Sequence, residues 1–449
     1  MSGPKVFHVV TREELVARCE VLLGRLEAAI DEWAQACEKS RIAGLVDFEA
    51  VKARRDAFRK MLDEDRFGEL QKHLPAEISF LRADAETRME KAAAETARAA
   101  QNLRRAHRAA QALLEALDKA GKALPEDLRR RLENPGAPDD LNTAISRAFT
   151  ILAPQPAAAE MTDRQRELAS SLGRDERRAT LADWLASQQI AEDRESDLRI
   201  DRHLAELQTF GLDTTAYSAR ATSIAGEPTA RQALLADSLL LDLAQAVKLG
   251  RQRATLAADL RERGSALTRY TSTASRSLRE RIERSLTQEL DESAMALLGE
   301  ADALIESQVR AIAVESRRRT VLQGLSSLGY EVNEGMITAW VNDGRVVLRK
   351  AANPDYGVEV GGGAKSDNLQ VRVVSFGDSA SPRNASRDRD METAWCSDFD
   401  KLRGLVSEAG GDLEIEHALP VGATPVKVVG LSQTQADWNV VSKLKLLER

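Results

Sequence analysis

Residues 75–121 read PAEISFLRADAETRMEKAAAETARAAQNLRRAHRAAQALLEALDKAG, and this stretch decides the fold class. Small and apolar side chains recur in it at steps of three and four residues, the period of one face of an α-helix. These positions are Ile78, Leu81, Ala85, Met89, Ala92, Thr96, Ala99, Leu103, Ala106, Ala110, Leu113 and Leu117. Pro75 is tolerated in a first helical turn and Gly121 ends the pattern. The stretch predicts one long helix with a partner helix close to its Ala-rich face.

A second long pattern covers residues 266–325. Apolar side chains recur in it with the same period, at Leu267, Tyr270, Ala274, Leu278, Ile282, Leu297, Ala301 and Leu304. The pattern predicts a helix of comparable length. We expect the helices 75–121 and 266–325 to pair antiparallel in a rod-like bundle.

The N-terminal region adds shorter helices. Thr11 and Glu14 have the spacing of a capping box, which predicts a helix to about residue 40. Asp47 is the expected cap of a second helix. Residues 6–10 alternate like a strand or an apolar arm. We divide the chain into helical regions at 1–134 and 135–327 and a C-terminal domain at 328–449.

The pattern changes to a period of two after residue 328. Asn342-Asp343-Gly344 predicts a hairpin turn between strands 337–341 and 345–349. Further strands are expected at 356–360, 369–376, 413–417 and 425–429. A helix is expected from about Ser386, and another in the C-terminal segment that contains Trp438, Val441 and Leu444. The predicted fold is mainly α: a long antiparallel coiled-coil or helical-bundle rod, then a small C-terminal α+β domain with an antiparallel sheet.

Composition narrows the class of protein. The 449 residues are 30% charged and 4% aromatic, a balance that suits helical bundles, and the net charge of −7 disfavours general binding to nucleic acid or anionic membranes. The N-terminal residues lack a signal-peptide pattern, no apolar run is long enough for a membrane span, and the three cysteines form no disulfide framework. We expect a cytoplasmic protein without a membrane partner.

Two motifs resemble ligand sites but lack essential parts. Residues 361–366 read GGGAKS, whereas a phosphate-binding loop needs Gly before Lys365 and a helix after it. The C-terminal domain is rich in acidic residues that could hold Mg²⁺ for hydrolysis. They are Asp388, Asp390, Glu392, Asp398, Asp400, Glu414 and Glu416, with His417 beside them. Asp388, Asp390 and Glu392 are expected on the solvated side of their helix, so a metal-dependent hydrolase or nuclease is kept only as an alternative.

Histidine and cysteine patterns give no metal or nucleophile signature. The five histidines are scattered, and Cys19 and Cys37 are too far apart on one helix to share a metal. No Gly-x-Ser-x-Gly motif is present. We assign no catalytic residue, no metal ligand and no cofactor.

Arginine clusters raise a nucleic-acid alternative. They lie at 129–131, at 276–284 and at 317–319, and each adjoins or alternates with Glu. Pairing of Arg with Glu four residues away on a solvated helix face explains most of them. A nucleic-acid-binding coiled-coil protein is therefore the less favoured alternative.

The favoured function is a non-enzymatic coiled-coil scaffold or adaptor that forms homo-oligomers and docks protein partners in a multi-subunit complex. A bacterial defence or chromosome-handling assembly is one context that fits. Loops tethered to strands often carry recognition residues. The predicted partner-binding residues are Lys365, Arg383, Arg387 and Asp388.

Overall fold

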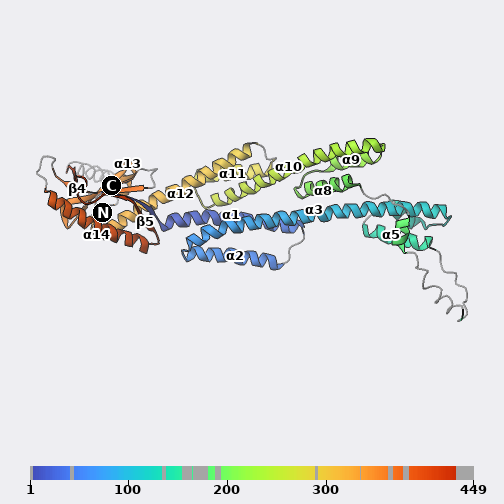
Figure 1. Ribbon diagram of the computed structural model, residues 1–449, viewed down its shortest axis with the longest axis horizontal. Helices are drawn as coiled ribbons and strands as arrows, with labels where there is room; N and C mark the ends of the chain where they lie inside the picture. The colour runs from blue at the N-terminus through green and yellow to red at the C-terminus, as the bar shows by residue number, and fades with distance from the viewer. Residues whose placement is uncertain are drawn as a thin grey trace, which may run out of the picture. The chain divides into compact units, whose positions relative to one another are not determined.

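The computed structural model describes residues 4–40, 45–133, 138–153, 164, 180–187, 194–288, 292–333, 335–362, 368–377 and 384–430. Long helices dominate, and an antiparallel sheet lies in the C-terminal part of the chain (Figure 1). The predicted class, mainly α with a small α+β domain, is confirmed. The chain forms two compact units, and the division falls within three long helices. Unit 1 comprises Met1–Glu32, Gly44–Arg82 and Leu256–Arg449, and unit 2 comprises Trp33–Ala43 and Ala83–Thr255.

Helices account for most of the described chain. Their bounds are α1 Arg12–Ser40, α2 Leu45–Asp63, α3 Phe67–Lys119, α4 Glu126–Glu133, α5 Pro138–Leu152, α7 Leu181–Ser187, α8 Glu195–Thr209, α9 Thr215–Ala225, α10 Thr229–Leu267, α11 Thr273–Thr287, α12 Glu292–Ser327, α13 Met336–Asp343 and α14 Ala385–Glu408. The strands are β1 Lys5–Val10, β2 Arg345–Lys350, β3 Asn353–Gly361, β4 Asn368–Phe376, β5 Asp412–Ala418 and β6 Lys427–Val429.

The sheet has the order β2-β3-β4-β1-β5, and β6 pairs with the other end of β4. All neighbours are antiparallel except β4 and β6. The N-terminal strand β1 therefore lies inside the sheet, between β4 and β5. Although the boundary at residue 328 leaves β1 out of the C-terminal domain, β1 supplies one of its inner strands.

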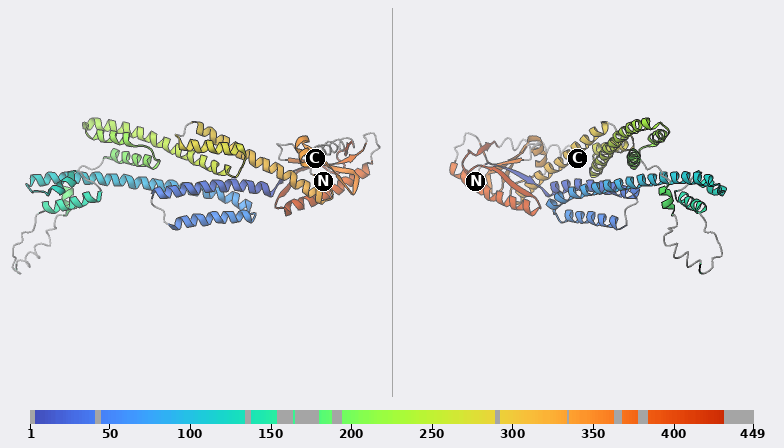
Figure 2. Two further views of the ribbon diagram at one scale, coloured as in Figure 1. Left: turned by 180° about the vertical axis from the view of Figure 1, so that it is seen from behind. Right: turned by 45° about the vertical axis from the view of Figure 1, so that its right-hand side comes forward.

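One face of the sheet is covered by the end of α12 and by α13 and α14 (Figure 2). Phe7 on β1 meets Phe399 on α14 edge to face at 5.2 Å between ring centroids. Trp395 is 2% exposed and lies in this core, as its spacing from Met391 and Phe399 on the predicted helix indicates. Gly324 allows α12 to approach α14 closely, because a Cβ atom there would overlap Leu402.

The predicted hairpin around residues 342–344 is wrong. Residues 336–343 form the helix α13, which buries Trp340, and β2 starts directly after it. Gly344 adopts a φ of 69° and donates its N–H to the carbonyl of Trp340, so it ends a helix. A Gly at a positive φ occurs both at helix C-termini and in hairpin turns, so Gly344 alone does not distinguish the two structures. The helical conformation is favoured here because it buries Trp340.

The predicted single helix over 266–325 is also wrong. Helix α10 continues to Leu267, and α11 ends at Thr287, before Gln288, whose backbone is extended. Leu278 and Ile282 of α11 pack with Leu297 and Ala301 of α12 in one core. Folding the pattern into two packed helices buries apolar faces that one straight helix would leave without this mutual contact.

The first predicted long helix is present but starts earlier and faces differently. Helix α3 begins at Phe67, so Pro75 lies inside it, beyond the first turn. In unit 2, Ala93 and Ala97 are buried against Ala205 of α8, whereas Ala99 is exposed. The predicted place of Ala99 in the closely packed face is wrong, because α8 packs here on the side of α3 that carries Ala93 and Ala97.

Two further apolar cores lie in unit 2. One joins the end of α3 to α4, α5 and α7, with Leu113, Leu117 and Leu141 fully buried. The other joins α8 and α9 to the first part of α10 around Leu239 and Leu243. Each helix in these clusters buries one apolar stripe against its neighbours.

Candidate functional site

The predicted partner-binding residues divide into two groups. Lys365 and Arg383 lie outside the described residues. Arg387 and Asp388 lie in the first turn of α14, where the Asn384 side chain accepts hydrogen bonds from the backbone N–H groups of Ser386 and Arg387. The structure thus brings two of the four residues together at one helix end.

Both of these side chains contact β3. Arg387 donates to Asp355 at 2.9 Å and lies over the Tyr356 ring, and the Tyr356 hydroxyl donates to Asp388 at 2.7 Å. Burial and then the hydrogen bond to Asp388 raise the pKa of Tyr356 to about 12, so this phenol stays a donor at neutral pH. Arg387 and Asp388 therefore hold α14 against the sheet.

Glu359 is a buried carboxylate of the α+β domain with three cationic partners. It is 5% exposed on β3, opposite Arg372 of β4. Arg372 and Lys427 donate to it at 2.9–3.2 Å, and Arg345 lies 3.5 Å away. Burial acts to raise its pKa, but the hydrogen bonds from Arg372 and Lys427 outweigh it and keep the pKa below its usual value. Both carboxylate oxygens are in use, so Glu359 connects β3 to β2, β4 and β6.

A second buried carboxylate joins α14 to the sheet. Asp398 accepts a hydrogen bond from the Tyr330 hydroxyl at 3.0 Å and pairs with Lys350. Burial, followed by the negative charge of Asp398, raises the pKa of Tyr330 far above its usual range. Tyr330 and Lys350 are themselves joined by an isolated β-bridge. These contacts connect α14 to β2 and to Tyr330.

The acidic residues considered for Mg²⁺ serve separate contacts. Asp388 binds Tyr356, Glu392 accepts the backbone N–H of Gly422 at 2.6 Å, and Asn368 donates to Glu416. Glu392 and Asp398 are buried, contrary to a simple solvated face. Among the residues with described positions, no group of three His, Cys, Asp or Glu side chains could hold a metal ion.

Where α1 begins, a buried ion pair connects it to α12. Arg317 and Glu14 are 4% and 1% exposed, and two hydrogen bonds of 2.9 and 3.0 Å join them. The Thr11 side chain accepts the backbone N–H of Glu14 and also contacts Ser316 at 2.6 Å. Thr11 therefore caps the helix as predicted, while the Glu14 carboxylate binds a residue 303 positions away. Local spacing cannot reveal that partner.

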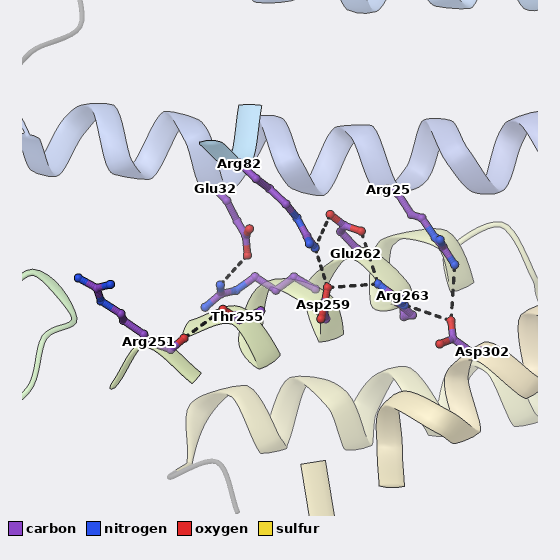
Figure 3. Close-up of polar contacts among 10 residues, drawn as sticks. Arg25, Glu32, Arg82, Arg251, Thr255, Asp259, Glu262, Arg263 and Asp302 are labelled. Atoms are coloured by element: carbon purple, nitrogen blue, oxygen red, sulfur yellow. Dashed lines mark hydrogen bonds and ion pairs between the residues drawn. The ribbon is translucent and has the colours of Figure 1, made fainter. Parts of the chain in front are cut away.

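A larger ionic network lies within unit 1, where α1, α3, α10 and α12 meet (Figure 3). It comprises Arg25 of α1, Arg82 of α3, Asp259, Glu262 and Arg263 of α10, and Asp302 of α12. Arg82 pairs with Asp259 at 2.8 Å and with Glu262 at 2.6 Å. Arg263 and Arg25 share Asp302 at 3.1 and 3.5 Å. Three cations and three anions alternate across four helices.

Burial sets the electrostatics of this network. Glu262 is 3% exposed, and burial raises its pKa against the opposing attraction of Arg82, Arg263 and Arg25. Burial and the like charge of Arg263 lower the pKa of Arg25. Because a shifted helix would leave one of these charges buried without its partner, we infer that the network specifies the helix register.

The arginine clusters behind the nucleic-acid alternative are largely paired. Arg129 binds Asp118 at 2.7 Å, and Arg281 binds Glu300 at 2.6 Å. Other described pairs in these clusters are Arg130–Glu126, Arg279–Glu283 and Arg319–Glu315. Arg317 and Arg318 are buried. A phosphate backbone would have to displace these carboxylates.

The exposed apolar side chains of the described residues include two features that bear on binding. On α10, Leu234 and Leu241 are 73% and 74% exposed, although the opposite side of the same helix is packed. On the sheet, Ile415 of β5 is 36% exposed at the end of the strand order. Neither was identified from the sequence, since a Leu or Ile in a periodic pattern reads as core until its neighbours are known.

No helix within the described residues combines the length and the hydropathy needed to cross a bilayer. Comparisons with known proteins gave no match to a family model, a curated protein or a solved structure.

Proposed function

We propose that this protein is a non-enzymatic scaffold or adaptor subunit of a cytoplasmic complex, which self-associates through α10 and docks protein partners. The observation that supports self-association most directly is the exposed pair Leu234 and Leu241. Seven residues turn an α-helix by about 700°, so the two leucines lie roughly 20° apart around its axis. This is the repeat of a coiled-coil contact.

A second copy of the chain is the proposed partner of this helix face. Charges of both signs flank the leucines, with Arg231 and Asp237 near the first and Asp242 and Lys248 near the second. Mixed signs allow two copies of one helix to pair without net repulsion. Coiled-coil leucines become buried only when such a partner packs on them.

Several polar side chains of the α+β domain have a structural role. Glu359, Asp398 and Asp388 are each satisfied by side chains of neighbouring elements. These contacts stabilise the domain and leave its polar groups committed to structure. Lys365 and Arg383 remain the proposed partner contacts, and we assign Arg387 and Asp388 an additional role in holding α14.

Sedimentation velocity of the full chain tests the self-association. We expect a concentration-dependent dimer or higher oligomer for the unaltered protein. The double variant Leu234→Asp/Leu241→Asp should be monomeric over about a hundredfold range of concentration. Ala233→Asp is the matched control, because Ala233 is exposed on the same helix but lies about 100° around its axis from Leu234. Circular dichroism should show equal helix content for all three proteins.

A monomeric unaltered protein would contradict the proposal. So would an oligomer of equal strength in the leucine variant and the control, because the contact would then lie elsewhere.

A further inference from the structure

Strand β5 forms one edge of the sheet. It pairs with β1, and no other described strand pairs with it. Every second backbone N–H and C=O of an edge strand points away from its only neighbour. Such an edge is ready to accept another strand.

The two faces of β5 differ in chemistry. Leu413 and Ile415 pair with Val9 and Phe7, which are buried on the face covered by α14. Ile415 is nevertheless 36% exposed, because nothing described covers it from the open edge. Glu414 lies opposite His8 on β1. A register shift leaves Glu416 without a β1 partner, and it accepts a hydrogen bond from Asn368, the β4 residue opposite His8, so both glutamates lie on the other face. Residues 412–418 contain no Lys or Arg. A complementary strand would place apolar residues beside Leu413 and Ile415 and cations beside the two glutamates.

Residues 440–447 of this chain, VVSKLKLL, have that pattern. Leu444 and Leu446 alternate with Lys443 and Lys445, and the segment contains no acidic residue. They lie after Gly430, outside the residues that the structure describes, as does the helix predicted in the segment around Trp438. The alternation of Lys and Leu over 443–446 is the pattern of a strand and favours a strand over that helix. We propose that residues 440–447 bind in cis to the free edge of β5 as an added strand.

The match holds in either strand direction. In the antiparallel register Leu444 lies beside Ile415, Lys443 beside Glu416 and Lys445 beside Glu414. In the parallel register each lysine still faces a glutamate. Cross-strand pairs of opposite charge stabilise a sheet, whereas like charges opposite each other destabilise it.

A second β5 is a poor occupant by the same rule. Two β5 strands paired antiparallel about Ile415 would place Glu414 opposite Glu416 twice. The acidic edge therefore disfavours edge-to-edge dimers and favours the basic segment.

The intervening chain is long enough. Strand β6 pairs with β4, and β5 lies two positions from β4 across β1. That separation is about 10 Å at a strand spacing of 4.7–4.9 Å. Thirteen residues join Gly430 to Lys443 and can extend to about 43 Å at 3.3 Å per residue.

Hydrogen exchange measured by mass spectrometry tests the proposal on the full chain. Amides in residues 412–418 should exchange at least about tenfold faster when the chain is ended at Gly430. Exchange in β3 should be unchanged and serves as the internal control. Equal exchange of residues 412–418 in both proteins would overturn the proposal.

Charge reversal separates the contact from any general effect of truncation. Glu414→Lys/Glu416→Lys in the full chain should also speed exchange of this strand. Adding Lys443→Glu/Lys445→Glu should restore protection. Glu408→Lys, an exposed acidic position outside β5, is the matched control and should change nothing. Failure of the compensating lysine substitutions to restore protection would count against the pairing.

A disulfide resolves which copy supplies the strand. Ile415→Cys and Leu444→Cys are introduced with Cys396→Ser, since Cys396 is only half-buried while Cys19 and Cys37 are buried. Oxidation should cross-link the two positions within one chain. A cross-link found only between chains would overturn binding in cis in favour of exchange between copies.

Discussion

Glu14 and Arg317 show what a single buried pair does for this molecule. They join the first turn of α1 to α12 beside the sheet core, and both are almost fully buried. Removing one partner leaves the other charge buried in the protein interior without a counter-charge, which destabilises the folded state. We expect Arg317→Ala to lower the free energy of unfolding by about 3 kcal/mol, the lower end for a buried pair, because Arg18 also contacts Glu14.

Arg319→Ala is the control for that experiment. Arg319 pairs with Glu315 four residues away, and their side chains are 52% and 64% exposed. Exposed pairs of this kind contribute about 0.5 kcal/mol or less. Urea unfolding of both variants should separate them clearly, and equal losses would show that the Glu14–Arg317 pair has no special role.

The pH dependence of stability should carry opposite contributions from two buried glutamates. The pKa of folded Glu359 lies below its usual 4.5, so its contribution is fully present above pH 4.5 and is lost as the pH falls through the folded pKa. The pKa of Glu262 is raised, so acidification from neutral pH towards 4.5 should favour the folded state. Urea unfolding as a function of pH measures both contributions. As the pH falls below 4.5, the wild type should lose its advantage in stability over Glu359→Gln. As the pH falls from neutral to 4.5, the wild type should gain stability relative to Glu262→Gln. Curves that move in the same direction would contradict this assignment.

Sequence reasoning located residues only where their partners are local. Thr11 was identified as a cap because the N–H it accepts lies three residues away. Glu14–Arg317 and Glu262–Arg82 join positions that are far apart in the chain, and a charged residue in a helical pattern reads as solvated without that knowledge. Arg387 and Asp388 were identified as exposed contacts, whereas their side chains bind β3.

At the scale of elements, the Ala-rich part of α3 offers a direct test of helix packing. Ala93 and Ala97 are buried against Ala205 of α8. Ala97→Leu adds three carbons at this close contact and should cost about 1–3 kcal/mol by overpacking. Ala99→Leu lies on the exposed side and should change stability by less than about 0.5 kcal/mol. Thermal unfolding followed by circular dichroism measures both, and a larger loss for Ala99→Leu would place the packed face where the heptad pattern put it.

The elements themselves were predictable where the pattern was long. The change from a period near 3.6 to a period of two separated the helices from the sheet, and β3, β4, β5 and α14 lie close to their expected positions. Short segments were ambiguous, because the eight residues of α13 carry too few apolar positions to distinguish helix from strand. The break after α11 has no Pro or Gly to signal it.

At the scale of the whole molecule, the sheet domain depends on both ends of the chain. β1 lies between β4 and β5, and the core of the sheet also contains Val321, Leu322 and Leu325 of α12. The sequence pattern could not assign β1 to this sheet, because the pattern of a six-residue strand does not specify which strands pair with it. The boundary near Gly329 therefore cuts through a packed core.

We therefore expect the fragment 328–449 to lack a cooperative unfolding transition. It has lost β1 and leaves the facing edges of β4 and β5 unpaired, which favours aggregation. The structure indicates how to restore it: the Thr11 side chain contacts Ser316, so residues 1–11 can be joined to residues 316–449 by a short Gly-Ser linker. This fusion should be monodisperse and unfold cooperatively in urea, and Phe7→Asp within it should abolish the transition, because Phe7 is 1% exposed against Phe399. A cooperative transition in the fragment 328–449 alone would show that the domain folds without its N-terminal strand.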